Sequence, residues 1–126
     1  MNEVDAIDYH ARNNNIPVEL VRSIIKVVSE GNPRKKLNGK YGLMQLELEG
    51  EVTDEKIEKL LDPVNNVSLG CLRLRSLREK ICYTPNSYDN LIREAYPDSW
   101  NKIMIDFESK CKYITQYKYI GDLTHG

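Results

Sequence analysis

The sequence predicts an all-α domain, and two observations carry that prediction. Apolar residues recur at helical spacing in several separate stretches, and Asn, Gly or Pro lies at the end of each stretch. Alternating apolar and polar residues, which would indicate strands, are weak throughout, so we expect at most one small irregular ribbon near residues 41–47. The length of 126 residues predicts a single domain over residues 1–126.

The first two helices have clear boundaries in the sequence. One is expected over residues 3–12, and the Asn run at 13–15 ends it because Asn favours caps and turns. The next is expected from Pro17, which suits a first helical turn, to Glu30, with Gly31 as its stop. Its apolar positions, spaced for one helix face, are Leu20, Val21, Ile24, Ile25 and Val28.

Residues 31–46 are expected to form loop and turn, because Asn32-Pro33 and Asn38-Gly39 are turn dipeptides. This segment carries a basic run, and an acidic stretch follows it over residues 47–58, so the two are expected to be solvated or paired with each other. The alternative is that the basic run binds an anionic cell-wall polymer or nucleic acid. The cations of the basic run are Arg34, Lys35, Lys36 and Lys40.

Four more helices complete the prediction. Asp-Pro at 62–63 and Thr-Pro-Asn at 84–86 separate the first three of them. The expected ranges are 54–61, 64–81, 88–95, and a last helix from residue 97 or 98 to about 119.

Charge and hydropathy exclude several function classes. Eighteen basic and nineteen acidic residues give a net charge of −1, which argues against a nucleic-acid binder. No apolar run is long enough for a membrane span, and we expect no signal peptide because no basic segment followed by an apolar one opens the chain. The compartment is left open.

The cysteines and histidines do not predict a metal site, and no cofactor is expected. Cys71, Cys82 and Cys111 are odd in number and lack a Cys-x-x-Cys spacing, while His10 and His125 lie at opposite ends of the chain. Buried or half-buried thiols are the plainest interpretation, and one disulfide beside one free thiol is the alternative.

By position, the candidate site is the end of the second helix together with residues 42–45. Gly42 lets a ligand approach the backbone closely, and the amide of Gln45 suits sugar hydroxyls. The alternative is that Leu43 and Met44 belong to the core and Gln45 only caps a turn.

Three motifs resemble the soluble lytic transglycosylase family, the goose-type lysozyme-like domain. Ser29 followed by Asn32-Pro33 resembles the end of the first motif, and Gly-Leu-Met-Gln at 42–45 matches the second residue for residue. The stretch 62–70, which starts with Asp-Pro and ends with Gly, matches the third.

Two weaker matches extend the resemblance. Ala95-Tyr96 resembles the start of an Ala-Tyr-Asn-Ala-Gly motif, and residues 108–114 resemble the closing helix, so the resemblance covers residues 5–120 in order. It implies a lysozyme-like fold, peptidoglycan as ligand, and a periplasmic or other extracytoplasmic location. The substrate-binding residues it implies, with tyrosines as sugar-stacking groups, are Ser29, Tyr41, Gly42, Leu43, Met44, Gln45, Tyr96 and Tyr113.

The chain departs from this family at two places. Val28 occupies the position of the family's catalytic Glu, in a register fixed by Ser29 and Asn32-Pro33. The resemblance implies that this Glu serves as both the general acid and the general base, whereas Val can neither donate nor accept a proton. Pro97-Asp98-Ser99 replaces the Asn-Ala-Gly that helps to line the family's sugar site.

These departures favour a pseudoenzyme that binds glycan strands or serves as a scaffold in a cell-envelope or phage assembly. One alternative is an active transglycosylase or lysozyme that cleaves the MurNAc-GlcNAc bond, either with Glu30 as the substitute acid or with Val28 as an engineered replacement of a natural Glu. On a regular helix Glu30 would lie about 200° from Val28, on the opposite face. A second alternative is a protein-interaction module without glycan binding.

Overall fold

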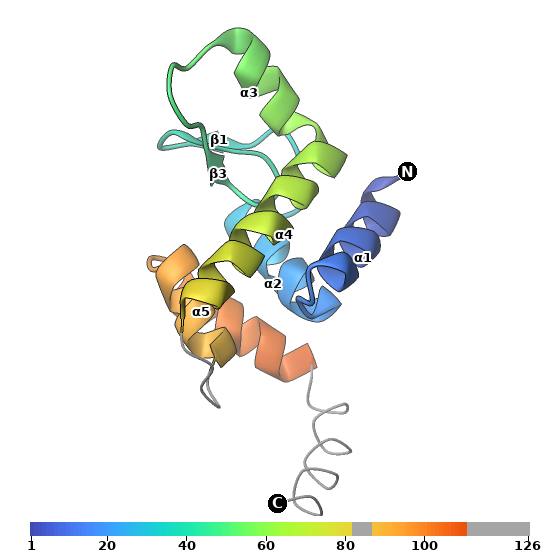
Figure 1. Ribbon diagram of the computed structural model, residues 1–126, viewed down its shortest axis with the longest axis vertical. Coiled ribbons are helices and arrows are strands. Elements are labelled where there is room, and N and C mark those ends of the chain that lie inside the picture. Colours follow the sequence, from blue (N-terminus) through green and yellow to red (C-terminus); the bar gives the residue numbers. More distant parts are fainter. Residues whose placement is uncertain (82–86, 111–126) are drawn as a thin grey trace, which may run out of the picture.

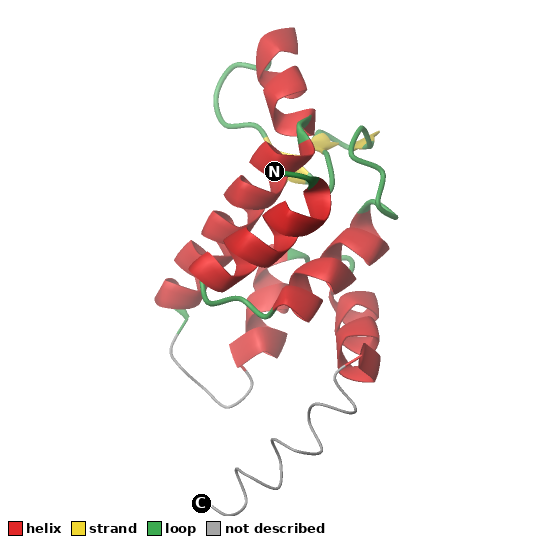
Figure 2. Ribbon diagram, turned by 90° about the vertical axis from the view of Figure 1, so that its right-hand side faces the viewer, coloured by secondary structure: helices red, strands yellow, loops and turns green. Residues whose placement is uncertain are grey.

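The computed structural model describes residues 1–81 and 87–110, and within them the fold is mostly helical, which confirms the predicted class. The three strands are two residues each and form one small ribbon (Figure 2). The elements in chain order are α1 (Glu3–Asn13), α2 (Val18–Val28), β1 (Lys36–Leu37), β2 (Lys40–Tyr41), β3 (Leu46–Glu47), α3 (Asp54–Leu61), α4 (Pro63–Lys80), α5 (Ser87–Ala95) and a helix over residues 100–110.

The long helix α4 organises the molecule, since it contacts α1, α3 and α5 (Figure 1). Its start is fixed by Asp62, whose carboxylate accepts a hydrogen bond from the Asn65 amide at 2.9 Å, and by Pro63 in the first turn. The ribbon and α3 lie at one end of α4, and α5 lies at the other (Figure 1).

The ribbon begins earlier in the chain than the sequence predicts. Strands β1, β2 and β3 pair antiparallel in that order, with Leu37 opposite Lys40 and Tyr41 opposite Leu46. Asn38 and Gly39 join β1 to β2, and both have positive φ, 53° and 73°. Two-residue hairpin turns of this kind favour Asn-Gly, so the basic run forms a hairpin where only loop and turn were expected.

Helix α2 ends at Val28, two residues before the expected end at Glu30. Glu30 and Gly31 both have positive φ, 54° and 77°, which no right-handed helix accommodates. Ser29 is buried, and its hydroxyl donates to the Ile25 carbonyl at 2.9 Å. The helix therefore ends where the chain turns toward the β1–β2 hairpin.

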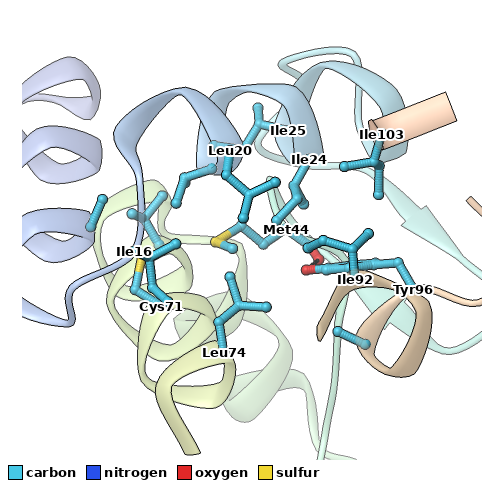
Figure 3. Packing of buried hydrophobic residues seen from close by; sticks show 14 of the residues in the cluster. Ile16, Leu20, Ile24, Ile25, Met44, Cys71, Leu74, Ile92, Tyr96 and Ile103 are labelled. Carbon is cyan, nitrogen blue, oxygen red and sulfur yellow. Dashed lines mark hydrogen bonds between the residues drawn. The ribbon is translucent and has the colours of Figure 1, made fainter. Parts of the chain in front are cut away.

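The core lies where α2, α4, α5 and the segment after β2 meet (Figure 3). Fully burying one large aliphatic side chain stabilises the fold by about 1.5–3 kcal/mol, so these residues dominate its stability. Burial also raises the pKa of the Cys71 thiol to about 12, which keeps it protonated and unreactive; Cys82 and Cys111 lie outside the described residues. The largest fully buried apolar side chains include Leu20, Ile24, Leu43, Met44, Leu74, Leu91, Ile92 and Ile103.

Candidate functional site

A cleft of about 280 Å³ lies beside the C-terminal end of α2. Its walls come from three parts of the chain: the last turn of α2, the β1–β2 hairpin, and the turn that follows α5. The lining residues are Val27 and Val28 from α2, Lys35, Leu37, Asn38 and Lys40 from the hairpin region, Gln45, and Tyr96, Pro97, Asp98 and Ser99.

Val28 lines this cleft with an isopropyl group, which neither donates nor accepts a proton. Its carbonyl oxygen accepts a hydrogen bond of 2.8 Å from the ammonium group of Lys35. The bond satisfies one of the carbonyls that a helix leaves unpaired at its end, and it holds the lysine over the α2 terminus.

Gln45 lies at the floor of the cleft and is 5% exposed. Its side-chain amide donates to the carbonyls of Lys35, at 3.1 Å, and Gly42, at 3.0 Å. The Lys35 carbonyl also accepts from the Gly42 amide at 2.9 Å. Gln45 therefore joins the basic segment to the turn at 42–45 as well as facing the cleft.

Behind the cleft, Asn66 on α4 holds the turn at 42–45 in place. Its carboxamide oxygen accepts from the Met44 amide at 2.8 Å, and its nitrogen donates to the carbonyls of Tyr41 and Leu60 at 2.9 and 2.7 Å. Asn66 is fully buried. Three bonds from one buried side chain fix the backbone that carries Gln45, because a buried polar group is costly to leave unpaired.

Two glycines permit this close approach. Gly42 has φ +82°, and a Cβ there would lie 2.2 Å from the amide nitrogen of Asn66. A Cβ at Gly70 would lie 2.2 Å from the sulfur of Met44. The two sequence motifs at 42–45 and 62–70 are thus the two halves of one packed unit.

Tyr96 closes the unit from the other side of the cleft. Its hydroxyl donates to the Met44 carbonyl at 2.7 Å, and Figure 3 shows the side chain reaching toward that residue. Burial raises the pKa of its phenol, so it stays a neutral donor. The guanidinium carbon of Arg73 lies 5.8 Å from the ring centroid.

The structure brings only some of the expected site residues to the cleft. Gln45 and Tyr96 line it with Val28, whereas Glu30 lines a separate pocket beside α1. Ser29, Gly42, Leu43 and Met44 are buried, Tyr41 is half-buried, and Tyr113 lies outside the described residues.

Lys35, Asn38, Lys40 and Asp98 line the cleft without having been singled out as site residues. The Asn-Gly dipeptide was the sequence signal that could have placed the first three at the cleft, because a hairpin turn there folds the basic run back beside α2. The acidic and basic stretches do meet, as expected: Arg34 pairs with Glu58 at 2.9 Å, and Lys40 lies opposite Glu47 in the ribbon.

Over residues 1–81 and 87–110, His, Cys, Asp and Glu form no cluster that could hold a metal ion. In the same ranges, no helix combines the length and the apolar character that a membrane crossing requires.

A mostly helical, lysozyme-like fold whose cleft is built on these interlocked motifs defines a lytic-transglycosylase-like domain. A family model described as the transglycosylase SLT domain matches residues 5–96, nearly three quarters of the chain, and the chain belongs to this family. The match ends at Tyr96, directly before Pro97. Searches of curated proteins and of solved structures find no match.

Proposed function

We propose that this domain binds peptidoglycan glycan strands in the cleft beside Val28 and does not cleave them. The observation that carries the proposal is the place of Val28, which lines the cleft at the end of α2, where the family resemblance puts the catalytic Glu. Without that carboxyl group, no side chain there protonates the glycosidic oxygen. General acid–base catalysis contributes about 10²–10⁴ to a rate, and here one group would serve both steps.

The chain keeps what a binding function needs. Asn66, Gly42 and Gly70 hold the cleft floor in a fixed conformation, and Gln45 and Tyr96 line it. Service as a scaffold within a cell-envelope or phage assembly is compatible with the same binding.

A second candidate function is a working murein-cleaving enzyme, and one observation favours it. Asp98 lines the same cleft as Val28, so a carboxyl group is present there although it lies on the opposite wall. Glu30 is the other alternative acid; it lies two residues from Val28 but lines the pocket formed with Ile7, Arg22 and Lys26.

The experiment is to incubate the purified domain with sacculi and to measure two quantities, the protein that pellets with them and the muropeptides that are released. We expect pelleting and no anhydromuropeptides by mass spectrometry. Product that disappears in Glu30→Gln or in Asp98→Asn would overturn the pseudoenzyme proposal and identify the acid. Neither pelleting nor product would favour a protein-interaction module.

The complementary test restores the missing group. In Val28→Glu the new carboxyl would share the end of α2 with the Lys35 ammonium, and a nearby cation lowers the pKa of a carboxyl group. We therefore expect little cleavage from Val28→Glu alone and more from Val28→Glu combined with Lys35→Met. Inactivity of both variants would assign the loss to the cleft wall at residues 97–99.

A further inference from the structure

The charged side chains around the cleft are predominantly cationic. Lys35 and Lys40 line it from the hairpin side, and Asp98 is the carboxylate that lines it among the described residues. None of the ion pairs among the described residues includes Lys35 or Lys40. Arg34, from the same basic run, forms an ion pair with Glu58 on α3. Glu47 lies opposite Lys40 in the register of β2 and β3, but neither cleft lysine forms an ion pair with a described carboxylate, whereas Arg34 does.

The hairpin determines which cations reach the cleft. Lys35 directly precedes β1, and Lys40 begins β2 after the Asn-Gly turn. Lys36 lies between them in the sequence but is exposed and does not line the cleft, because successive side chains in a strand point to opposite faces. Both cleft lysines are half-buried.

We propose that the cleft binds an anionic group of its ligand, a carboxylate, between Lys35 and Lys40. The inference rests on the proposed function and specifies which part of a glycan strand the cleft recognises. The Val28 carbonyl takes one hydrogen bond from Lys35, which leaves two of its three ammonium hydrogens for a ligand. Lys40 has all three, and the side chain of Asn38 lines the cleft beside them.

Replacement of a carboxyl group by Val28 gives the cleft this capacity. A Glu at this position would place a negative charge beside Lys35, and that charge would pair with the lysine and repel an incoming anion. With Val28 in its place, Lys35 donates to the Val28 carbonyl and forms no ion pair with a described carboxylate. The change that removes acid catalysis therefore also makes the cleft suitable for an anion.

Peptidoglycan offers carboxylates in two places. Each muramic acid carries a lactyl carboxylate, which is free when the stem peptide has been removed, and the stem peptide has carboxylates of its own. The β-1,4-linked oligomer of N-acetylglucosamine has a closely similar backbone and carries none. The two lysines would distinguish these saccharides by charge.

The test is isothermal titration of the domain with three saccharides at low salt: a peptide-free GlcNAc-MurNAc tetrasaccharide, the same tetrasaccharide with stem peptides, and tetra-N-acetylchitotetraose. We expect the neutral saccharide to bind at least about tenfold more weakly than one of the anionic ones, the change for one lost charge-assisted hydrogen bond. The anionic saccharide that binds more tightly identifies the carboxylate. Equal affinity for all three, or binding of none, would overturn the proposal.

Variants assign the effect to the cleft. Lys35→Met and Lys40→Met should each weaken binding of the anionic saccharide about tenfold, whereas Lys36→Met, the matched control on the same hairpin, should leave it unchanged. Asp98→Asn should strengthen binding because it removes the opposing charge. The ammonium group of Lys40 makes no hydrogen bond to the described residues, so its variant tests the charge without disturbing the α2 terminus. Equal losses in the Lys36 and Lys40 variants would indicate general surface charge and contradict the proposal.

Failure of this inference is distinguishable from failure of the proposed function. If the wild-type domain pellets with sacculi while Lys35→Met and Lys40→Met pellet equally well, glycan binding stands and the carboxylate site is wrong. If the wild-type domain neither pellets nor binds any of the saccharides, both are wrong.

Discussion

The floor of the cleft and its walls resemble the family motifs to different extents. In the floor, residues 42–45 match the family motif and are held by Asn66, with Gly42 and Gly70 permitting the contact. In the walls, Val28 lies where the sequence resemblance places the family's acid, and Pro97-Asp98-Ser99 follows the point where the family match ends. The comparison distinguishes the residues that hold the cleft in shape from the residues that line its walls.

The largest effect is expected at Asn66. Asn66→Ala removes three buried hydrogen bonds and leaves the Met44 amide and two carbonyls without partners, which should lower the free energy of unfolding by about 3–5 kcal/mol. Asn65→Ala is the matched control, since Asn65 is half-buried and its side chain makes one bond, to the Lys59 carbonyl. Urea unfolding measures both. Similar losses in the two variants would contradict the account of the floor.

A smaller effect is expected at Gly70. Gly70→Ala places a methyl group 2.2 Å from the Met44 sulfur and 3.2 Å from its Cβ, and overpacking of this kind costs about 1–3 kcal/mol. Combined with Met44→Ala, the two losses should sum to less than their separate values, because the second substitution removes the obstacle. Strictly additive losses would show that these residues do not interlock.

The helix over residues 100–110 lies outside the family match. An ion pair of 3.0 Å between its Asp106 and Lys26 ties it to α2. Burial acts to raise the pKa of Asp106, but the Ser23 hydroxyl and the ammonium groups of Lys26 and Lys110 outweigh it and lower the pKa to about 2. Because the folded pKa is below the ordinary value of 3.8, this carboxylate stabilises the fold above pH about 4, and the stabilisation is lost as the pH falls toward 2.

The matching measurement compares the urea midpoints of the wild-type domain and Asp106→Asn from pH 7 to pH 2. We expect the wild type to be the more stable at pH 7 and the difference to shrink between pH 4 and pH 2. A difference that is independent of pH would mean that this ion pair does not anchor the last helix.

The smallest effect on stability is expected in the wall. Val28→Glu places a polar side chain in an open, half-buried position, so the free energy of unfolding should change by less than about 1 kcal/mol. A loss as large as that of Asn66→Ala would place Val28 in the structural framework and remove the contrast between floor and wall.

Much of the fold could be predicted from sequence, because its helices are bounded by local signals. Pro17, Asp62-Pro63 and the Asn run at 13–15 set helix ends within a residue or two of those observed. The end of α2 was predicted two residues late, because positive φ at Glu30 depends on the tertiary path toward the hairpin and not on local propensity.

The cleft was less predictable. Its floor followed from a motif, whereas its cationic wall depends on how the β1–β2 hairpin folds back on α2, a contact between residues distant in sequence. Of the residues expected to bind substrate, Leu43 and Met44 proved fully buried, since an apolar run beside a glycine turn fits core and cleft equally well.

Digestion of purified sacculi tests the central claim most directly. The wild-type domain should sediment with the sacculi and release no anhydromuropeptides that mass spectrometry detects, even in prolonged incubation. Release of anhydromuropeptides by the wild-type domain, abolished by substitution of a single carboxylate, would contradict the claim that the residue at position 28 has ended the chemistry of this cleft.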